Sequence, residues 1–388
     1  MPGKIEASLN KKLQAVEWGE YTLGDFFRIE NTLSFNTDKL VDGNDYDYIT
    51  RTSLNQGILR STGFVNEENI NPAGTWSLGL LQMDFFYRKK PWYAGQFVRK
   101  IIPKIEINGA AILFFSTLLN KQKPRLLSVL VRDVDKTFLS TKIQLPIKDG
   151  KIDFDFMESF VAELEAQRVA ELSAYLKVSG YDNYELSAEE LDALRRFSSL
   201  EDGNWGTYKV GTLFERVVTK KLPYKAKELP KQPTEDYVLP CLTSSFQNQG
   251  LNYYAPKAGA TVLSNVISIP SNSDVYRAYY QSREFTVLSD SYAIRWKSDK
   301  IKISPNHYLF MVMCINKVTD LPIYSYKNKL GGWNVVKGKY IRLPEKDGKI
   351  DFAFMETFIS AIKKLAIKDV VIYSDQKIAT TKKAISRS

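Results

Sequence analysis

The sequence predicts an α+β protein with two tandem mixed α/β domains of the same fold, separated by long helices that pair as an antiparallel coiled coil about a pseudo-twofold axis. Three observations predict this fold class. The second half of the chain repeats the first, each copy is rich in β-branched and aromatic residues, and each copy ends in a segment with heptad spacing. The 388 residues, 44% hydrophobic and 25% charged, have the composition of an ordinary globular protein.

The internal repeat is strongest just before the two predicted helices. Residues 145–158 and 343–356 are identical at twelve of fourteen positions, with an offset of 198. Residues 17–27 resemble residues 204–214 at an offset of 187, and the offset rises through 193 and 196 between these points. Such a steady rise is typical of collinear copies with small loop insertions. The predicted segments are an N-terminal lead at 1–16, a first domain at 17–150, a connector helix region at 151–203, a second domain at 204–348 and a distal helix at 349–388.

Each domain begins with a Trp-Gly pair and an amphipathic stretch, and its body contains runs typical of strands. In the second domain these runs are residues 262–270, 285–296 and 335–343. Residues 309–316 fit a short buried helix or a strand, because periodicity alone does not separate the two. The body of each domain is therefore expected to be dominated by twisted sheet.

Each domain is followed by a predicted helix of about 20–30 residues. Asp153 and Asp351 follow a Lys-Asp-Gly-Lys turn, where they are placed to cap these helices. Residues 157–177 are acidic and residues 363–388 are basic, which favours pairing of the two helices; packing of each helix on its own domain is the alternative. The residues assigned to the apolar seam are Met157, Val161, Leu164, Leu172, Met355, Phe358, Ile362, Leu365 and Ile372.

Charge and residue counts exclude several classes of protein. The net charge is +10, and because residues 153–203 are strongly acidic, the positive surplus is concentrated in the two domains. Such a surplus favours binding to a polyanion, although a protein that is merely basic fits equally well. One histidine, His307, and two cysteines exclude a multi-histidine metal centre, a cysteine-rich zinc site and a disulfide framework, so no metal is expected. No apolar run approaches the ~20 residues of a membrane span, and residues 1–12 have no signal-peptide core, so we expect a cytoplasmic protein with no membrane partner.

The duplicated architecture resembles the specificity (S) subunit of type I restriction–modification systems, and the S subunits of type IIB systems are also similar. The resemblance rests on the two Leu-Pro-x-Lys-Asp-Gly-Lys-Ile-Asp-Phe-x-Phe-Met-Glu entries, with support from residues 264–270, 279–285 and 324–328. It covers essentially residues 17–385. One departure is a second short helical stretch at 187–200 within the connector.

The resemblance implies a phage-defence protein in which each domain is a target-recognition domain that reads one half of a split site in double-stranded DNA. It implies that the helices fix the spacer between the half-sites and dock two copies of an adenine-methyltransferase (modification) subunit, with restriction subunits as optional partners. S-adenosylmethionine would then bind to the methyltransferase, and this chain would contain no cofactor and no catalytic residue.

Residues suited to DNA recognition lie in a matching loop of each domain. Arg pairs well with guanine, and Asn or Gln with adenine, in the major groove. The alternative is that the shared Asn-Gln-Gly sequence only builds a turn. The candidates are Arg51, Thr52, Ser53, Asn55, Gln56 and Arg60 in the first domain, and Ser244, Ser245, Gln247, Asn248 and Gln249 in the second.

Two further clusters combine basic with aromatic residues, which suits contacts to phosphates and groove edges. The first, at residues 87–93, supplies Arg88, Lys89 and Lys90, for which a solvated charged turn is the alternative. The second consists of Tyr276, Arg277, Lys327, Asn328 and Lys329, with Lys121, Lys123 and Arg125 as rough counterparts in the first domain.

Motifs of catalysis are missing from the sequence. It contains no Walker loop, no Gly-x-Gly-x-x-Gly and no Asn-Pro-Pro-Tyr motif of amino-methyltransferases, and no evident nucleophile stands beside His307. A non-catalytic DNA-recognition subunit is therefore favoured. The alternatives are a stand-alone enzyme that acts on a polyanion and a DNA-binding scaffold or regulator.

Overall fold

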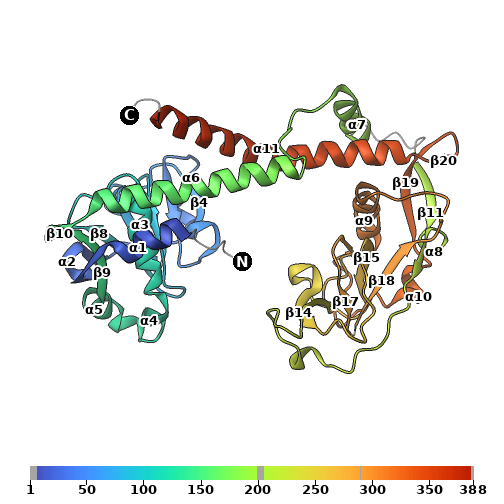
Figure 1. The fold of residues 1–388 in the computed structure, drawn as a ribbon, viewed down its shortest axis with the longest axis horizontal. Helices are drawn as coiled ribbons and strands as arrows, with labels where there is room; N and C mark the ends of the chain where they lie inside the picture. The colour runs from blue at the N-terminus through green and yellow to red at the C-terminus, as the bar shows by residue number, and fades with distance from the viewer. Residues whose placement is uncertain (1–6, 199–204, 289, 386–388) are drawn as a thin grey trace. The chain divides into compact units, whose positions relative to one another are not determined.

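Two units with the same topology make up the chain, which is described by a computed structural model (Figure 1). The structure describes residues 7–198, 205–288 and 290–385. Unit 1 comprises Met1–Tyr175 and Ser374–Ser388, and unit 2 comprises Leu176–Tyr373. The last turns of the C-terminal helix therefore belong to the first unit.

The described residues of unit 1 form three small sheets. The central sheet has the strand order β2-β8-β5-β6, the second has the order β4-β3-β7 with β3 parallel to β7, and the third has the order β1-β9-β10. The elements are α1 (Ala7–Ala15), β1 (Glu17–Thr22), α2 (Leu23–Phe26), β2 (Phe27–Asn31), β3 (Tyr46–Ile49), η2 (Leu54–Gly57), β4 (Ile58–Thr62), β5 (Thr75–Gly79), β6 (Asp84–Arg88), β7 (Trp92–Ala94), β8 (Val98–Pro103), α3 (Ala111–Lys121), α4 (Lys123–Leu127), α5 (Val134–Leu139), β9 (Lys142–Lys148), β10 (Lys151–Ile152) and α6 (Phe154–Val178).

Unit 2 repeats this topology strand by strand. Its sheets have the orders β12-β18-β15-β16, β14-β13-β17 with β13 parallel to β17, and β11-β19-β20. The agreement confirms the internal repeat and the α+β fold class. The elements are α7 (Ala188–Ser198), β11 (Trp205–Lys209), α8 (Val210–Leu213), β12 (Phe214–Arg216), β13 (Leu239–Leu242), η6 (Gln247–Gly250), β14 (Leu251–Ala255), β15 (Val266–Pro270), β16 (Tyr279–Gln281), β17 (Thr286–Val287), β18 (Ser291–Trp296), α9 (Pro305–Thr319), α10 (Trp333–Val336), β19 (Tyr340–Lys346), β20 (Lys349–Ile350) and α11 (Phe352–Ile385).

Two local predictions are resolved by these elements. The ambiguous run at 309–316 lies inside helix α9. The strand expected at 335–343 begins only at Tyr340, because Gly332 and Gly338 flank one helical turn, α10, that buries Val336 completely. Val336 therefore packs into the core from a helical turn rather than from a strand, while Val335 is exposed.

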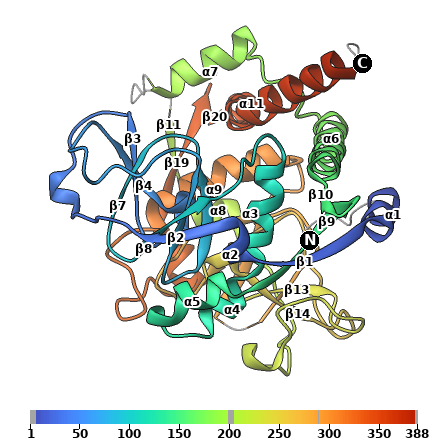
Figure 2. The same cartoon turned by 90° about the vertical axis from the view of Figure 1, so that its left-hand side faces the viewer.

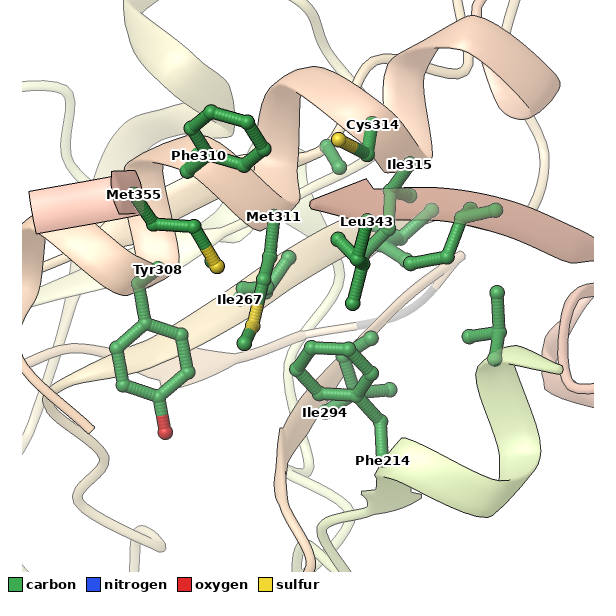
Figure 3. Close-up of a cluster of buried hydrophobic side chains, with 14 of the residues drawn as sticks. Phe214, Ile267, Ile294, Tyr308, Phe310, Met311, Cys314, Ile315, Leu343 and Met355 are labelled. Atoms are coloured by element: carbon green, nitrogen blue, oxygen red, sulfur yellow. The ribbon is translucent and has the colours of Figure 1, made fainter. Parts of the chain in front are cut away.

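The first turn of each long helix belongs to the core of its own domain. Figure 3 shows the buried cluster of unit 2, in which Met311 of α9 lies with Ile267 of β15 and Ile294 of β18. Met355, at the start of α11, is part of this cluster, and Met157, at the start of α6, is part of the corresponding cluster of unit 1. At these positions the alternative arrangement, in which each helix packs on its own domain, is the correct one.

The predicted caps are confirmed, but the predicted seam is partly wrong. Asp153 Oδ1 accepts a hydrogen bond from the Phe156 backbone N–H at 2.8 Å, and Asp351 caps α11 in the same way. Ile362 and Leu365 are 40% and 47% exposed. The early turns of α11 bury Phe358, Ile359 and Ala361 instead, which leaves Ile362 and Leu365 on the outer side. Of the other seam residues, Val161, Leu164, Leu172 and Ile372 are half-buried.

A short lead helix packs on the long helix of its own unit. In unit 1, Lys12 of α1 forms an ion pair with Glu163 of α6. In unit 2, Lys364 of α11 forms an ion pair with the buried Glu190 of α7, with 2.9 Å between Nζ and Oε2. The helical stretch expected at 187–200, whose last two residues lie outside the described part of the chain, is therefore the second copy of α1.

The acidic and basic long helices meet within unit 1. The last turns of α11 lie beside α6 and run in the opposite direction (Figures 1 and 2), and Lys377 Nζ is 2.6 Å from Glu165 Oε1. This ion pair joins the acidic helix to the basic end of the other, as the charge pattern predicts.

Candidate nucleic-acid interface

The Asn-Gln-Gly sequence forms the same unusual turn in both units. Asn55 and Gln56 both have left-handed backbone conformations, with φ of 46° and 54°, and Asn248 and Gln249 have φ of 47° and 54°. Left-handed conformations are strained for residues other than glycine, and two in succession persist only where surrounding contacts fix them. Such strain is concentrated at functional sites.

Several hydrogen bonds close each turn at its base. The Thr50 backbone N–H donates to Gly57 O at 2.8 Å, and Thr243 N–H donates to Gly250 O at 2.9 Å. The Asn55 side-chain amide donates to Ile58 O at 3.1 Å. Asn248 makes the same bond to the carbonyl of Leu251. Asn55 and Asn248 thus build the turn, as the alternative interpretation proposed, while their side chains remain exposed.

The turn of unit 1 presents a polar and cationic surface. Arg51, Ser53 and Gln56 are exposed, and the Arg51 guanidinium lies 5.3 Å from the centre of the Phe97 ring. Ser53 donates a hydrogen bond to Asp84, whose carboxylate also pairs with Lys123 at 2.6 Å. The structure therefore brings Lys123 to the turn. Arg60 is exposed on β4, and Thr52 is half-buried in the turn.

The turn of unit 2 borders a groove of about 630 Å³. Its lining combines Ser244, Ser245, Gln247 and Asn248 with Lys231, Gln232, Asn252, Tyr253 and Tyr254. Exposed amides together with half-buried hydroxyls and aromatic rings around a groove suit contacts to base edges and sugars. Four of the five residues predicted for this turn are thus gathered at one site.

An ion pair beside each turn has opposite polarity in the two units. In unit 1 the carboxylate is on β6 (Asp84) and the cation on α4 (Lys123). In unit 2 the cation is Arg277, just before β16, and the carboxylate is Asp320, at the end of α9, 2.6 Å away. In both pairs the cation is the more exposed partner. Each unit therefore has an accessible cation in an ion pair between the β6 or β16 segment and the helix that follows it.

Two predicted DNA contacts do not fit the structure. Arg88 is only 3% exposed, and burial lowers the pKa of its guanidinium to about 10. Tyr276 is 1% exposed and belongs to the core of unit 2. Both side chains point inward because β-strand alternation and the approach to β16 direct them to the interior, which a basic or aromatic run in the sequence does not reveal.

The remaining predicted residues are scattered. Lys89 and Arg125 are exposed, and Lys90 is engaged with Asp47 at 2.8 Å. Lys121 lines a separate groove together with Trp18 and Lys142. In the loop after α9, Lys327 is exposed, Lys329 lies over the Tyr326 ring, and Asn328 bonds within its own loop to the Ile323 carbonyl.

Sequence reasoning missed a lysine-rich arm in unit 2. This arm, residues 217–238, links β12 to β13 and carries five exposed lysines, for which no ion pair is found among the described residues. The arm also carries Glu228, Glu235 and Asp236, whereas its counterpart in unit 1, residues 32–45, carries Asp38, Asp42 and Asp45 but one lysine. The signal was present in the rise of the repeat offset from 187 to 193 across this segment. The five lysines are Lys220, Lys221, Lys225, Lys227 and Lys231.

The described residues offer little for catalysis. Burial raises the pKa of the Cys241 and Cys314 thiols to about 12, which leaves them protonated and unreactive at neutral pH. His307 is bonded on both sides of its ring, to the Ser304 N–H and the Phe352 carbonyl, and so joins α9 to α11. Within the described part of the chain, no group of three His, Cys, Asp or Glu residues could bind a metal, and no helix is long and apolar enough to cross a bilayer.

Two copies of one α/β fold, each with a polar turn of the same strained geometry, define a two-domain protein with one candidate recognition surface in each domain. The chain belongs to the family described as the type I restriction modification DNA specificity domain, whose model matches residues 15–174 and 202–372.

Two known proteins illustrate the relationship. The chain is 23% identical over 351 residues to the specificity subunit S.BcgI of the type II restriction enzyme BgcI from Heyndrickxia coagulans, covering 88% of this chain and 95% of that one. The crystal structure of a type I restriction–modification S subunit from M. genitalium shares the fold, with a TM-score of 0.52 and 12% identity over 94% of this chain and 93% of the other.

Proposed function

We propose that the protein is the specificity subunit of a restriction–modification complex, in which each unit reads one half of a bipartite site in double-stranded DNA through its Asn-Gln-Gly turn. The observation that carries this proposal is the duplicated left-handed turn, with the same backbone in both units and different side chains around it. One scaffold with two side-chain sets is what two different half-sites require.

The chemistry of the two turns supports direct contact with bases. Arg51 and Gln56 in unit 1, and Gln247 and Gln249 in unit 2, are exposed side chains of the types that pair with guanine and adenine edges. Lys123 and Arg277, the more exposed partners of their ion pairs, would contact the phosphates that flank those bases.

The long helices are the proposed docking sites for two adenine-methyltransferase subunits, with S-adenosylmethionine bound there and restriction subunits as optional partners. On α11, the exposed Ile362, Leu365, Val370 and Tyr373 lie on one face, because their spacing of three, eight and eleven residues matches helical periodicity. We call these four residues the α11 stripe. An exposed apolar face of this kind suits a helical partner. The helices would also set the spacer between the half-sites.

The test compares methylomes of cells with and without the gene. Loss of one two-part adenine-methylated motif is the expected result, and it would also give the sequence and spacer. In a reconstituted reaction, the isolated chain should not methylate DNA, and addition of the methyltransferase subunit should give methylation only at that motif. An unchanged methylome, together with binding to DNA without sequence preference, would favour a scaffold or regulator instead.

A further inference from the structure

Beneath the turn of unit 1, Arg88 connects three segments. It extends from the end of β6 and donates from Nη2 to the backbone carbonyl of Gln56 at 2.6 Å. Its Nε also donates to Ser77 Oγ, on the neighbouring strand β5, at 2.9 Å. The guanidinium thus bonds to the carbonyl of the second left-handed residue.

Gln281 has the same place in unit 2. It ends strand β16, is 4% exposed, and donates from Nε2 to the Gln249 carbonyl at 3.2 Å. The same Nε2 donates to Ser268 Oγ on β15 at 3.0 Å. Ser77 and Ser268 occupy equivalent positions in the strand register of the two units. Both units therefore have the same pair of hydrogen bonds, from one buried donor to a serine hydroxyl and to the carbonyl of the turn, although the donor is Arg88 in unit 1 and Gln281 in unit 2.

This arrangement is demanding for the fold. Burial of an arginine is unfavourable, and it lowers the pKa of Arg88 although the charge of Asp47 partly offsets this effect. Among the described residues no carboxylate lies within ion-pair distance of the guanidinium. The left-handed residues add strain of their own. If the only role of this position were to fill space in the core, an apolar side chain would stabilise the fold more than a buried arginine.

We propose that Arg88 and Gln281 are positioning residues for DNA recognition, each of which fixes the orientation of its turn, and hence of the base-reading side chains, through one backbone carbonyl. This inference rests on the proposed function. It assigns to Arg88 an indirect role in place of the direct DNA contact predicted from the sequence.

The two copies should differ in strength. Arg88 donates as a cation, and charge-assisted hydrogen bonds are shorter and stronger than those of a neutral amide, in agreement with 2.6 Å against 3.2 Å. Arg88 also places a positive charge directly below the turn of unit 1. The turn of unit 2 has a neutral donor there, so it is the more deformable of the two.

The experiment uses the full chain in complex with the methyltransferase subunit. Binding is measured to a duplex with the complete bipartite site and to two duplexes, each with one half-site altered; the ratio of affinities is the discrimination at that half-site. Arg88→Met should lower discrimination at one half-site about tenfold or more and leave the other unchanged. Gln281→Met should lower discrimination at the other half-site and leave the first unchanged. Arg88→Gln should retain most of the discrimination that Arg88→Met loses, because a glutamine makes the equivalent hydrogen bond in unit 2.

A matched control separates positioning from loss of stability. Ser116→Ala removes a partly buried hydrogen bond of the same unit, which Trp76 Nε1 donates at 2.8 Å and in which no residue of the turn takes part. It should lower the melting temperature without changing either discrimination ratio. Hydrogen exchange at the Thr50 amide, which bonds to Gly57 O, should rise in Arg88→Met and not in Ser116→Ala.

The outcomes separate the two proposals. Equal losses at both half-sites, or unchanged discrimination with unchanged exchange at Thr50, would overturn the positioning role. If the wild-type complex shows no preference for the bipartite duplex, the proposed function fails, and the exchange measurement still decides whether Arg88 fixes the turn.

Discussion

Gly57, the last residue of the unit 1 turn, shows how narrow the conformational requirements of the turn are. Its φ is +79°, and a Cβ atom there would lie 3.1 Å from the Thr50 carbonyl oxygen. Gly74 has nearly the same φ, +78°, but open space around it. Substitution of Gly74 therefore reports backbone strain alone, and substitution of Gly57 reports the same strain together with a steric conflict at the turn.

Gly57→Ala is expected to lower the free energy of unfolding of unit 1 by about 1 kcal/mol or more beyond the loss in Gly74→Ala. Both variants carry the cost of a left-handed alanine, but only Gly57→Ala also brings a Cβ atom into close contact with the backbone of the turn. Denaturant unfolding of the two variants measures the difference. Equal losses of stability would mean that the backbone around Thr50 shifts to accommodate the added Cβ atom at little cost in free energy.

The two thiols give a residue-scale prediction for pH. Burial raises the pKa of Cys241 and Cys314 to about 12, so at pH 8 only about one thiol in ten thousand is ionised in the folded chain. A thiol reagent should not label the native protein and should label both residues in guanidinium. Because the folded-state pKa is raised, the stabilisation is complete below the ordinary thiol pKa and declines as the pH rises towards 12. Rapid native labelling at pH 8 would contradict the burial.

At the scale of elements, the lysine-rich arm gives unit 2 an electrostatic surface that unit 1 lacks. Each phosphate neutralised by a lysine steepens the salt dependence of DNA binding by about one unit. Lys231 also lines the groove beside the turn, so the arm and the recognition turn share one surface.

Lys227→Gln together with Lys231→Gln should lower affinity for all DNA sequences and reduce the salt slope by about one to two units, with discrimination intact. The control is Lys300→Gln together with Lys302→Gln, which removes the same charge from two exposed lysines outside the arm. These lysines precede α9, whose first turn contacts the start of α11 rather than the recognition turn. Titrations at several salt concentrations give the slopes. Equal slopes for the two double variants would remove the arm from the DNA surface.

The α11 stripe supports a prediction about assembly. Ile362→Ser with Leu365→Ser should weaken binding of the methyltransferase subunit about tenfold or more, while folding is retained because both side chains are partly exposed. Ile301→Ser is a control of the same residue type, with 42% exposure against 40% for Ile362. Calorimetry with the purified partner measures the affinity, and undiminished binding would exclude this face.

On the scale of the whole molecule, α11 is shared between the two units. Its residues after Tyr373 belong to unit 1, where Lys377 pairs with Glu165 of α6. Truncation after Tyr373 should therefore speed hydrogen exchange in α6 more than in the remaining part of α11. Lys377→Gln in the full chain should have a much smaller effect, since an exposed ion pair contributes about 0–1 kcal/mol. Unchanged exchange in α6 would show that the last turns add nothing to unit 1.

Much of the architecture was predictable because the sequence contains an internal repeat, so each half could be aligned with the other. The near-identical entries at 145–158 and 343–356 predicted the turns and the capped helices, and the offsets predicted that the domains would share one topology. The orientation of the helices was not predictable in the same way. Apolar spacing gives one face but not the neighbour that covers it, so Ile362 and Leu365 were assigned to a seam that they do not join.

The candidate site was only partly predictable for a related reason. The Asn-Gln-Gly match located both turns, but sequence alone does not distinguish an exposed arginine from one buried beneath a loop. Alignment of Arg88 with the uncharged Gln281 was the available sign that charge was not the shared requirement at this position. A hydrogen-bond donor is what the two residues have in common.

The reversed ion pairs limit how the two halves of the gene can recombine. A crossover that joined β6 of the first copy to α9 of the second would place Asp84 against Asp320, and the reciprocal product would place Arg277 against Lys123. Like charges at a partly buried site destabilise both hybrids. Viable exchanges of specificity between the halves should therefore transfer residues 84–123 or 277–320 as intact blocks, with breakpoints outside them.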